Sequence, residues 1–181
     1  MVLVVLLLLA GLRPAQAEPT ADERFAPFAQ LLGRWQGYTE KPDGSAPGLL
    51  ERTYAPALHG KFIRVESVVM FPPEVAGTYY EIHRDIEFIS YDVAAERYLL
   101  RGFYVEGFVT REAITIVESP PSLVFESEAI ENGPEGMRTR HTLTLEGEDR
   151  LIDRFEIAMP GLGFKTYQTA HLRRLEIDGG H

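Results

Sequence analysis

Two ionisable side chains, His141 and Asp153, fall on the apolar face of a predicted β-hairpin. If residues 147–149 form a three-residue loop, Arg140 faces Glu156 on a polar face that carries opposite charges. That face is the solvent face, so His141 and Asp153 lie on the other one, close to each other. A histidine–carboxylate pair can act as an acid–base couple, and it can also be a buried polar pair whose members only satisfy each other.

A third ionisable group, Arg84, is predicted to point into the same interior. In residues 79–91 acidic side chains alternate with apolar ones, and the usual preference for apolar side chains in the core turns the acidic set outward. Arg84 is then the one charge among inward-facing apolar groups. Because an unpaired buried charge is unfavourable, Arg84 must meet a carboxylate from Asp153, from Glu66 or from a ligand.

Other chemical signatures are missing from the sequence. There is no cysteine, no H-E-x-x-H or H-x-H spacing, no G-x-S-x-G, no P-loop and no G-x-G-x-x-G. We therefore expect no metal site and assign no catalytic residue, and an enzymatic activity is not favoured. The net charge of −9 also disfavours nucleic acid and anionic membrane surfaces as partners.

The elements that must position these side chains are almost all strands. Asp22–Leu32 has apolar residues at spacings of three and four, which predicts one short amphipathic helix that ends at Gly33. Turn residues then separate ten predicted strands: Arg34–Thr39, Leu49–Tyr54, Lys61–Phe71, Tyr79–Tyr91, Arg97–Glu106, Phe108–Val117, Leu123–Ile130, Met137–Leu145, Leu151–Ala158 and Phe164–Leu175. This pattern predicts an all-β fold, either a sandwich or, as we favour, an antiparallel up-and-down barrel with the helix closing one end.

The first residues have the pattern of a cleaved secretory signal. An apolar run over Val2–Leu12 is followed by Ala15-Gln16-Ala17, and the run is shorter than the roughly 20 residues that span a bilayer. We expect cleavage after residue 17, a single barrel domain over residues 18–181, and a secreted or periplasmic protein without membrane insertion. The alternative is that this segment forms a buried N-terminal helix.

The segment Gly33-Arg34-Trp35, directly after the predicted helix, resembles the G-x-W opening of the calycin barrels, the group of lipocalins, fatty-acid-binding proteins and nitrobindins. The resemblance runs from about Phe25 to Leu175, and it is closest to uncharacterised secreted bacterial members of this small-barrel type. It implies that Trp35 packs against a basic residue of the last strand, either Arg173 or Arg174. Ten strands resemble the fatty-acid-binding and nitrobindin-like barrels more than the eight-stranded lipocalins.

The resemblance also implies two kinds of site. Buried arginine and tyrosine residues hold the ligand carboxylate in fatty-acid-binding proteins, and Arg84 with Tyr80 or Tyr104 would do so here. Nitrobindins bind ferric haem through a histidine near the C-terminus, usually followed by leucine, and His171-Leu172 stands at a comparable place. Nitrobindins extend their opening to a longer glycine-rich run, from which residues 38–42 depart.

The sequence thus favours a binding module for a small apolar or amphipathic molecule. A ten-stranded barrel is too wide for its own side chains to fill, so we expect a cavity. The predicted ligand-binding residues are Tyr80, Arg84, Tyr104, His141 and Asp153, with apolar lining from Phe62, Val68, Ile82, Phe88, Phe125 and Phe155. The alternatives are a haem protein with His171 as axial ligand and a filled barrel that meets a protein partner through its acidic outer face.

Overall fold

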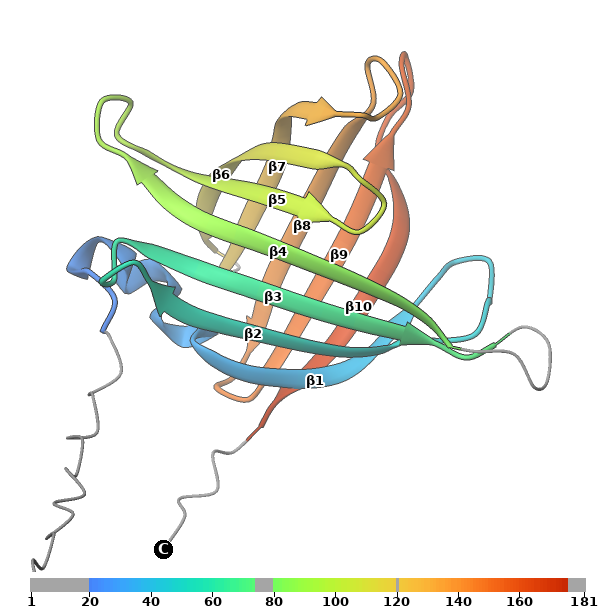
Figure 1. The fold of residues 1–181 in the computed structure, drawn as a ribbon, viewed down its shortest axis with the longest axis horizontal. Helices are drawn as coiled ribbons and strands as arrows, with labels where there is room; N and C mark the ends of the chain where they lie inside the picture. The colour runs from blue at the N-terminus through green and yellow to red at the C-terminus, as the bar shows by residue number, and fades with distance from the viewer. Residues whose placement is uncertain (1–19, 74–79, 120, 176–181) are drawn as a thin grey trace, which may run out of the picture.

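The chain folds into a closed barrel of ten antiparallel strands, described by a computed structural model over residues 20–73, 80–119 and 121–175 (Figure 1). Each strand pairs with the next along the chain, and β1 pairs with β10 to close the ring. The predicted leader, residues 1–17, lies outside the described residues. The strands are β1 (Gly33–Glu40), β2 (Leu49–Ala57), β3 (Phe62–Phe71), β4 (Glu81–Asp92), β5 (Arg97–Tyr104), β6 (Val109–Glu118), β7 (Pro121–Glu131), β8 (Arg138–Glu146), β9 (Arg150–Ala158) and β10 (Lys165–Arg174).

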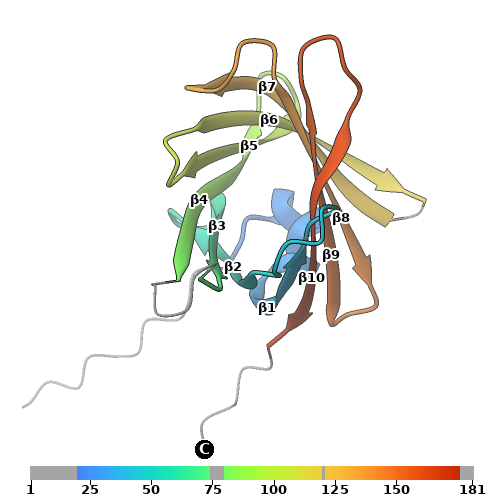
Figure 2. The same ribbon diagram turned by 90° about the vertical axis from the view of Figure 1, so that its right-hand side faces the viewer.

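A short 3₁₀ helix, η1 (Glu23–Leu31), closes one end of the barrel. The carboxylate of Asp22 caps its first turn, and the apolar side chains of Phe25, Phe28 and Leu31 are buried. In Figure 2 the helix is seen within the ring of strands. The predicted helix at the barrel end is confirmed.

Trp35, the tryptophan of the G-x-W segment on β1, contacts both η1 and β10. Trp35 is fully buried, and its indole N–H donates to the carbonyl oxygen of Leu31 at 2.7 Å. The guanidinium of Arg174 lies 4.3 Å from the indole centroid and also donates to the carbonyl oxygen of Leu32 at 2.6 Å. The basic residue that packs on Trp35 is therefore Arg174, whereas Arg173 is exposed and lies 4.0 Å from Asp149.

At the seam between β1 and β10 the two backbones come unusually close at a glycine. Gly37 is opposite Leu172, and a Cβ atom at position 37 would lie 1.8 Å from the carbonyl oxygen of His171. A glycine inside a strand commonly marks such a close backbone approach. Closure of the barrel at this point depends on the absence of a side chain.

The barrel interior is apolar at the helix end and polar at the other. Buried Trp35, Ile63, Ile89, Leu151 and Leu172 belong to the core cluster that also includes the buried side chains of η1. Beyond this core the inward positions of β4 carry acidic side chains. The register shows this, since Asp85 is opposite Ser67 and Glu87 is opposite Val65, and Ser67 and Val65 are both buried.

This orientation of β4 corrects the prediction from alternation. Arg84 is exposed and opposite Val68 on the outer face, and Ile82 and Ile86 on the same face are each 45% exposed. The alternation identified two faces, but the acidic one faces inward because the barrel encloses a polar space at that end.

Candidate functional site

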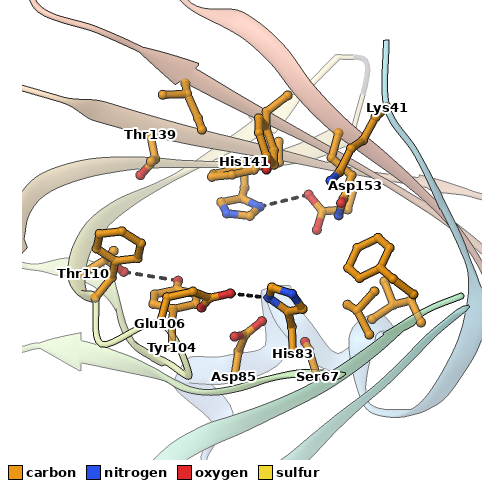
Figure 3. Close-up of a pocket in the computed structure, with 18 of the residues that line it drawn as sticks. Lys41, Ser67, His83, Asp85, Tyr104, Glu106, Thr110, Thr139, His141 and Asp153 are labelled. Carbon is orange, nitrogen blue, oxygen red and sulfur yellow. Dashed lines mark hydrogen bonds and ion pairs between the residues drawn. The ribbon is translucent and has the colours of Figure 1, made fainter. Parts of the chain in front are cut away.

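A cavity of about 600 Å³ occupies the end of the barrel opposite η1 (Figure 3). This volume lies within the range of small-molecule sites. Its wall combines apolar and aromatic side chains, including Val69, Phe71, Phe108, Phe155 and Tyr167, with several ionisable groups. Among the described residues, the ionisable side chains that line it are Lys41, Arg52, Glu81, His83, Asp85, Tyr104, Glu106, Glu112, His141, Asp153 and Tyr167.

One wall of the cavity is built around the buried carboxylate of Asp153. Its Oδ2 accepts from Nη1 of Arg52 at 2.8 Å, and its Oδ1 is 3.1 Å from Nδ1 of His141. Arg52 also donates from Nε to the hydroxyl of Ser67 at 2.9 Å. The predicted proximity of His141 and Asp153 is confirmed, and the arginine that joins them comes from β2.

The charges of this group stabilise one another. Burial alone would raise the pKa of Asp153, but His141 and Arg52 hold it well below its usual value. Burial opposes the charge on His141, yet the adjacent Asp153 carboxylate outweighs it and raises the pKa of His141 to about 9. A histidine that is protonated at neutral pH cannot accept a proton, so this arrangement favours a fixed charged cluster over an acid–base couple.

The cavity wall also carries acidic groups with fewer partners. Glu112 on β6 is 1% exposed; its Oε1 accepts from the hydroxyl of Thr139 at 3.5 Å, and its Oε2 is buried without a hydrogen-bond partner among the described residues. Burial raises the pKa of Glu112 to about 7, which His141 partly counteracts and Glu87 reinforces. A carboxyl oxygen buried without a partner at a cavity wall is unusual and calls for an explanation.

Asp85 and Tyr104, on the neighbouring strands β4 and β5, face His141 and Asp153 across the cavity (Figure 3). Tyr104 donates from its hydroxyl to Oε1 of Glu87 at 2.8 Å, and its oxygen lies 3.3 Å from the hydroxyl of Thr110. Burial and the nearby carboxylates of Glu87 and Glu106 raise the pKa of Asp85 to about 6. The wall is therefore rich in carboxyl groups that do not ionise as readily as in water.

The outer part of the cavity has its own charged groups. His83 contacts Glu106 through Nδ1 and Glu81 through Nε2, the latter at 2.8 Å. The ammonium group of Lys41 lies 5.0 Å from the ring centroid of Phe71 and 5.4 Å from that of Tyr167. Both basic side chains at this level are thus already in contact with carboxylates or aromatic rings.

The structure brings together only some of the predicted site residues. Tyr104, His141 and Asp153 line the cavity, as do Phe155 and, in a deeper chamber of about 60 Å³ that shares residues with it, Phe125. Tyr80 is 60% exposed and, like Arg84, is not part of the lining. Four predicted apolar lining residues lie on the outer face by the strand register: Phe62, Val68, Ile82 and Phe88.

His171 does not fit the axial-ligand position that the resemblance implied. It lies on the outer face of β10, where its ring stacks on Tyr38 at 5.2 Å and its Nε2 is 3.3 Å from Oε2 of Glu40. A haem inside the cavity would be out of its reach, and the cavity histidines, His83 and His141, are each bound to carboxylates. The described residues also contain no group of three or more histidine, aspartate or glutamate side chains that could hold a metal ion.

The residues that sequence reasoning missed are Arg52, Asp85 and Glu112. Arg52 is opposite Trp35 in the β1–β2 ladder, which shows that it faces inward, but that register follows from the closed sheet and not from local sequence. Asp85 was placed on the wrong face of β4. For Glu112 the available signal was a lone charge between Thr110 and Ile114, at inward positions of β6.

The charged cluster makes stability depend on pH. Because the pKa of His141 is raised to about 9 in the folded chain, the stabilisation is complete below its ordinary value near 6.5 and is lost as the pH rises toward 9. We expect the melting temperature to fall between pH 7 and 9.5, by the equivalent of about 1–3 kcal/mol. His141→Gln should flatten this fall in a thermal melt series, whereas the outer-face variant His171→Gln should keep it; an identical fall in His141→Gln would contradict the assignment.

Comparison with known proteins supports the fold. The chain is similar to the crystal structure of Rv2717c from M. tuberculosis, with a TM-score of 0.65 and 17% sequence identity over 86% of this chain and 99% of that chain. At this identity the similarity shows a shared small β-barrel fold. No protein-family profile and no curated protein matches the chain.

A search for membrane-spanning helices gives a negative result for the described part of the chain. None of its helices is both long enough and apolar enough to cross a bilayer.

Proposed function

We propose that this protein is a binding module that holds a small amphipathic molecule in the cavity opposite η1. The observation that carries the proposal is the cavity itself: about 600 Å³, with aromatic and aliphatic walls and a few converging polar groups. Pockets of this size and mixed lining are the usual sites of small-molecule binding. The cavity also argues against the filled-barrel alternative, which requires that side chains occupy the interior.

We further propose that the protein is exported by its first 17 residues. The support is the apolar run followed by Ala15-Gln16-Ala17. Expression in a bacterial host followed by mass measurement of the mature chain tests this, since cleavage leaves Glu18 at the N-terminus. A chain that keeps residues 1–17 would count against export.

A neutral fluorescent probe tests the binding function. N-phenyl-1-naphthylamine is dark in water and fluoresces in apolar surroundings, so we expect its emission to rise on titration with the protein. Val69→Trp should weaken probe binding by about tenfold or more. Val69 is buried and lines the cavity, so the indole ring of a tryptophan would fill part of the cavity volume that the probe needs.

The adjacent residue supplies the matched control. Val68 is opposite Arg84 on the outer face of the same strand, so Val68→Trp adds the same bulk outside the cavity and should leave probe binding unchanged. Absence of any probe signal with the unmodified protein, or equal weakening in the two variants, would overturn the proposed function.

A further inference from the structure

Carboxyl groups outnumber cations on the cavity wall. Among the described residues, five carboxyl groups line the cavity, against Lys41, Arg52 and the protonated His141. Glu87 adds a further carboxylate in the deeper chamber. A site of this composition repels an anionic guest unless its cations are free to bind one.

The cations of the described wall are already bound. Arg52 is held by Asp153 at 2.8 Å and by Ser67 at 2.9 Å, and the other cationic partner of Asp153 is His141. Lys41 lies over two aromatic rings. A carboxylate guest would have to compete with Asp153 for Arg52, or draw Lys41 away from its two aromatic rings, because Arg84, which was predicted to bind it, is on the outside of the barrel.

The carboxyl groups of Glu112 and Asp85 are not satisfied in this way. Glu112 is almost completely buried, and its Oε2 has no hydrogen-bond partner among the described residues. The positive group that acts on Glu112 is His141, which is bonded to Asp153. The hydroxyl of Thr110 also favours the charged form of Glu112, while Glu87 and Asp153 act on it as like charges. Glu87 and Glu106 act on Asp85 as like charges, and Arg52 and His83 act on it as opposite charges. A bound cation would supply the missing counter-charge.

The apolar part of the wall suits the same guest. Phe108, Phe155 and Tyr104 line the cavity together with the acidic groups, and aromatic faces attract organic cations. In Figure 3 Asp85 and Tyr104 face His141 and Asp153 across the open space, so a guest between the walls would reach the acidic side.

We infer that the guest is an organic cation, an ammonium group on an apolar body, whose positive charge interacts with the carboxyl group of Glu112 or of Asp85. This inference rests on the proposed binding function and assigns the chemical class of its ligand. It differs from the carboxylate ligand that the resemblance to fatty-acid-binding proteins implied.

Competition among three ligands with the same ten-carbon chain tests the inference. Decylamine, decanol and decanoate are each used to displace N-phenyl-1-naphthylamine at pH 8, where the amine is cationic and the acid is anionic. We expect decylamine to displace the probe at a concentration about tenfold or more below that of decanoate, with decanol in between. Decanoate displacing as well as or better than decylamine would overturn the inference.

A pair of double variants isolates the role of the two carboxyl groups. Glu112→Gln with Asp85→Asn removes acidic groups inside the cavity, whereas Glu51→Gln with Glu66→Gln removes the same number from the outer faces of β2 and β3. We expect the inner pair to abolish the preference for decylamine and the outer pair to preserve it, with circular dichroism confirming that both fold.

The outcomes separate the two proposals. A preference for decylamine that survives in the inner pair would show that the site is not at Glu112 and Asp85 and would overturn the inference alone. Failure of the unmodified protein to bind the neutral probe would overturn the proposed binding function first, and the cationic guest with it.

Discussion

Asp153→Ala is expected to lower the free energy of unfolding by about 3–5 kcal/mol, a large part of the stability of a domain of this size. Asp153 is 3% exposed and accepts from both Arg52 and His141. Without it, His141 can release its proton at neutral pH, but the guanidinium of Arg52 stays charged and loses its carboxylate partner. The measurement is urea denaturation at pH 7 followed by tryptophan fluorescence, since Trp35 is in the core.

Two controls distinguish the loss of this charge partner from a general effect of substitution. Asp149→Ala removes an exposed carboxylate 4.0 Å from Arg173 and should change stability by less than about 1 kcal/mol. Arg52→Met with Asp153→Leu removes both charges and should be more stable than Asp153→Ala alone. An Asp153→Ala variant as stable as the Asp149→Ala control would show that the cluster does not stabilise the barrel.

Gly37→Ala is expected to disrupt closure of the barrel and to lower the free energy of unfolding by about 3 kcal/mol or more. The added methyl group would lie 1.8 Å from the carbonyl oxygen of His171 and 2.9 Å from Cα of Leu172, both backbone atoms of β10. Backbone atoms in a paired strand cannot move aside as a flexible side chain can. Relief of the clash therefore requires separation of β1 from β10.

The same substitution at Gly163 is the control for Gly37→Ala. No atom lies within 4 Å of a Cβ at Gly163 in the described structure, and its backbone is not in the left-handed region. Gly163→Ala should therefore fold and melt like the unmodified protein, whereas Gly37→Ala should give a low yield of folded protein or a much lower urea midpoint. Equal midpoints would mean that β1 and β10 tolerate a wider separation than the structure shows.

Much of the architecture could be predicted because it is encoded locally. Turn residues delimit the ten strands, and the observed boundaries differ from the predicted ones by two residues or fewer, except at the end of β2, which was predicted at Tyr54 and lies at Ala57. The β8–β9 hairpin has the predicted register, with Arg140 opposite Glu156, because loop length and cross-strand charge pairs together allow one pairing. That register also placed His141 beside Asp153.

The orientation of β4 could not be predicted, because alternation defines two faces without saying which is inside. The prediction put the apolar set inward, yet Asp85 lines the cavity and Ile86 is 45% exposed. In a barrel with a polar cavity, the assumption of an apolar interior holds at the filled end and fails at the hollow end. Arg84 and Tyr80 were misplaced for this reason.

Contacts between strands that are distant in the sequence could not be predicted from local sequence patterns either. Arg52 and Asp153 are 101 residues apart and meet across the interior. The choice between Arg173 and Arg174 depended on which parity of β10 faces inward, and that is set by its register with β1, where Trp35 is opposite Arg174. The resemblance predicted a contact between Trp35 and an arginine of the last strand, and only the register of the closed sheet identifies that arginine as Arg174.

The plug formed by η1 has a kinetic consequence. With Phe25, Phe28 and Leu31 packed into one end of the barrel, the described residues close that end to a bound molecule. Entry and exit then take place away from η1. Substitutions that narrow the opening used for both, without touching the bound molecule, should slow loading and unloading by the same factor and leave the equilibrium occupancy as it was.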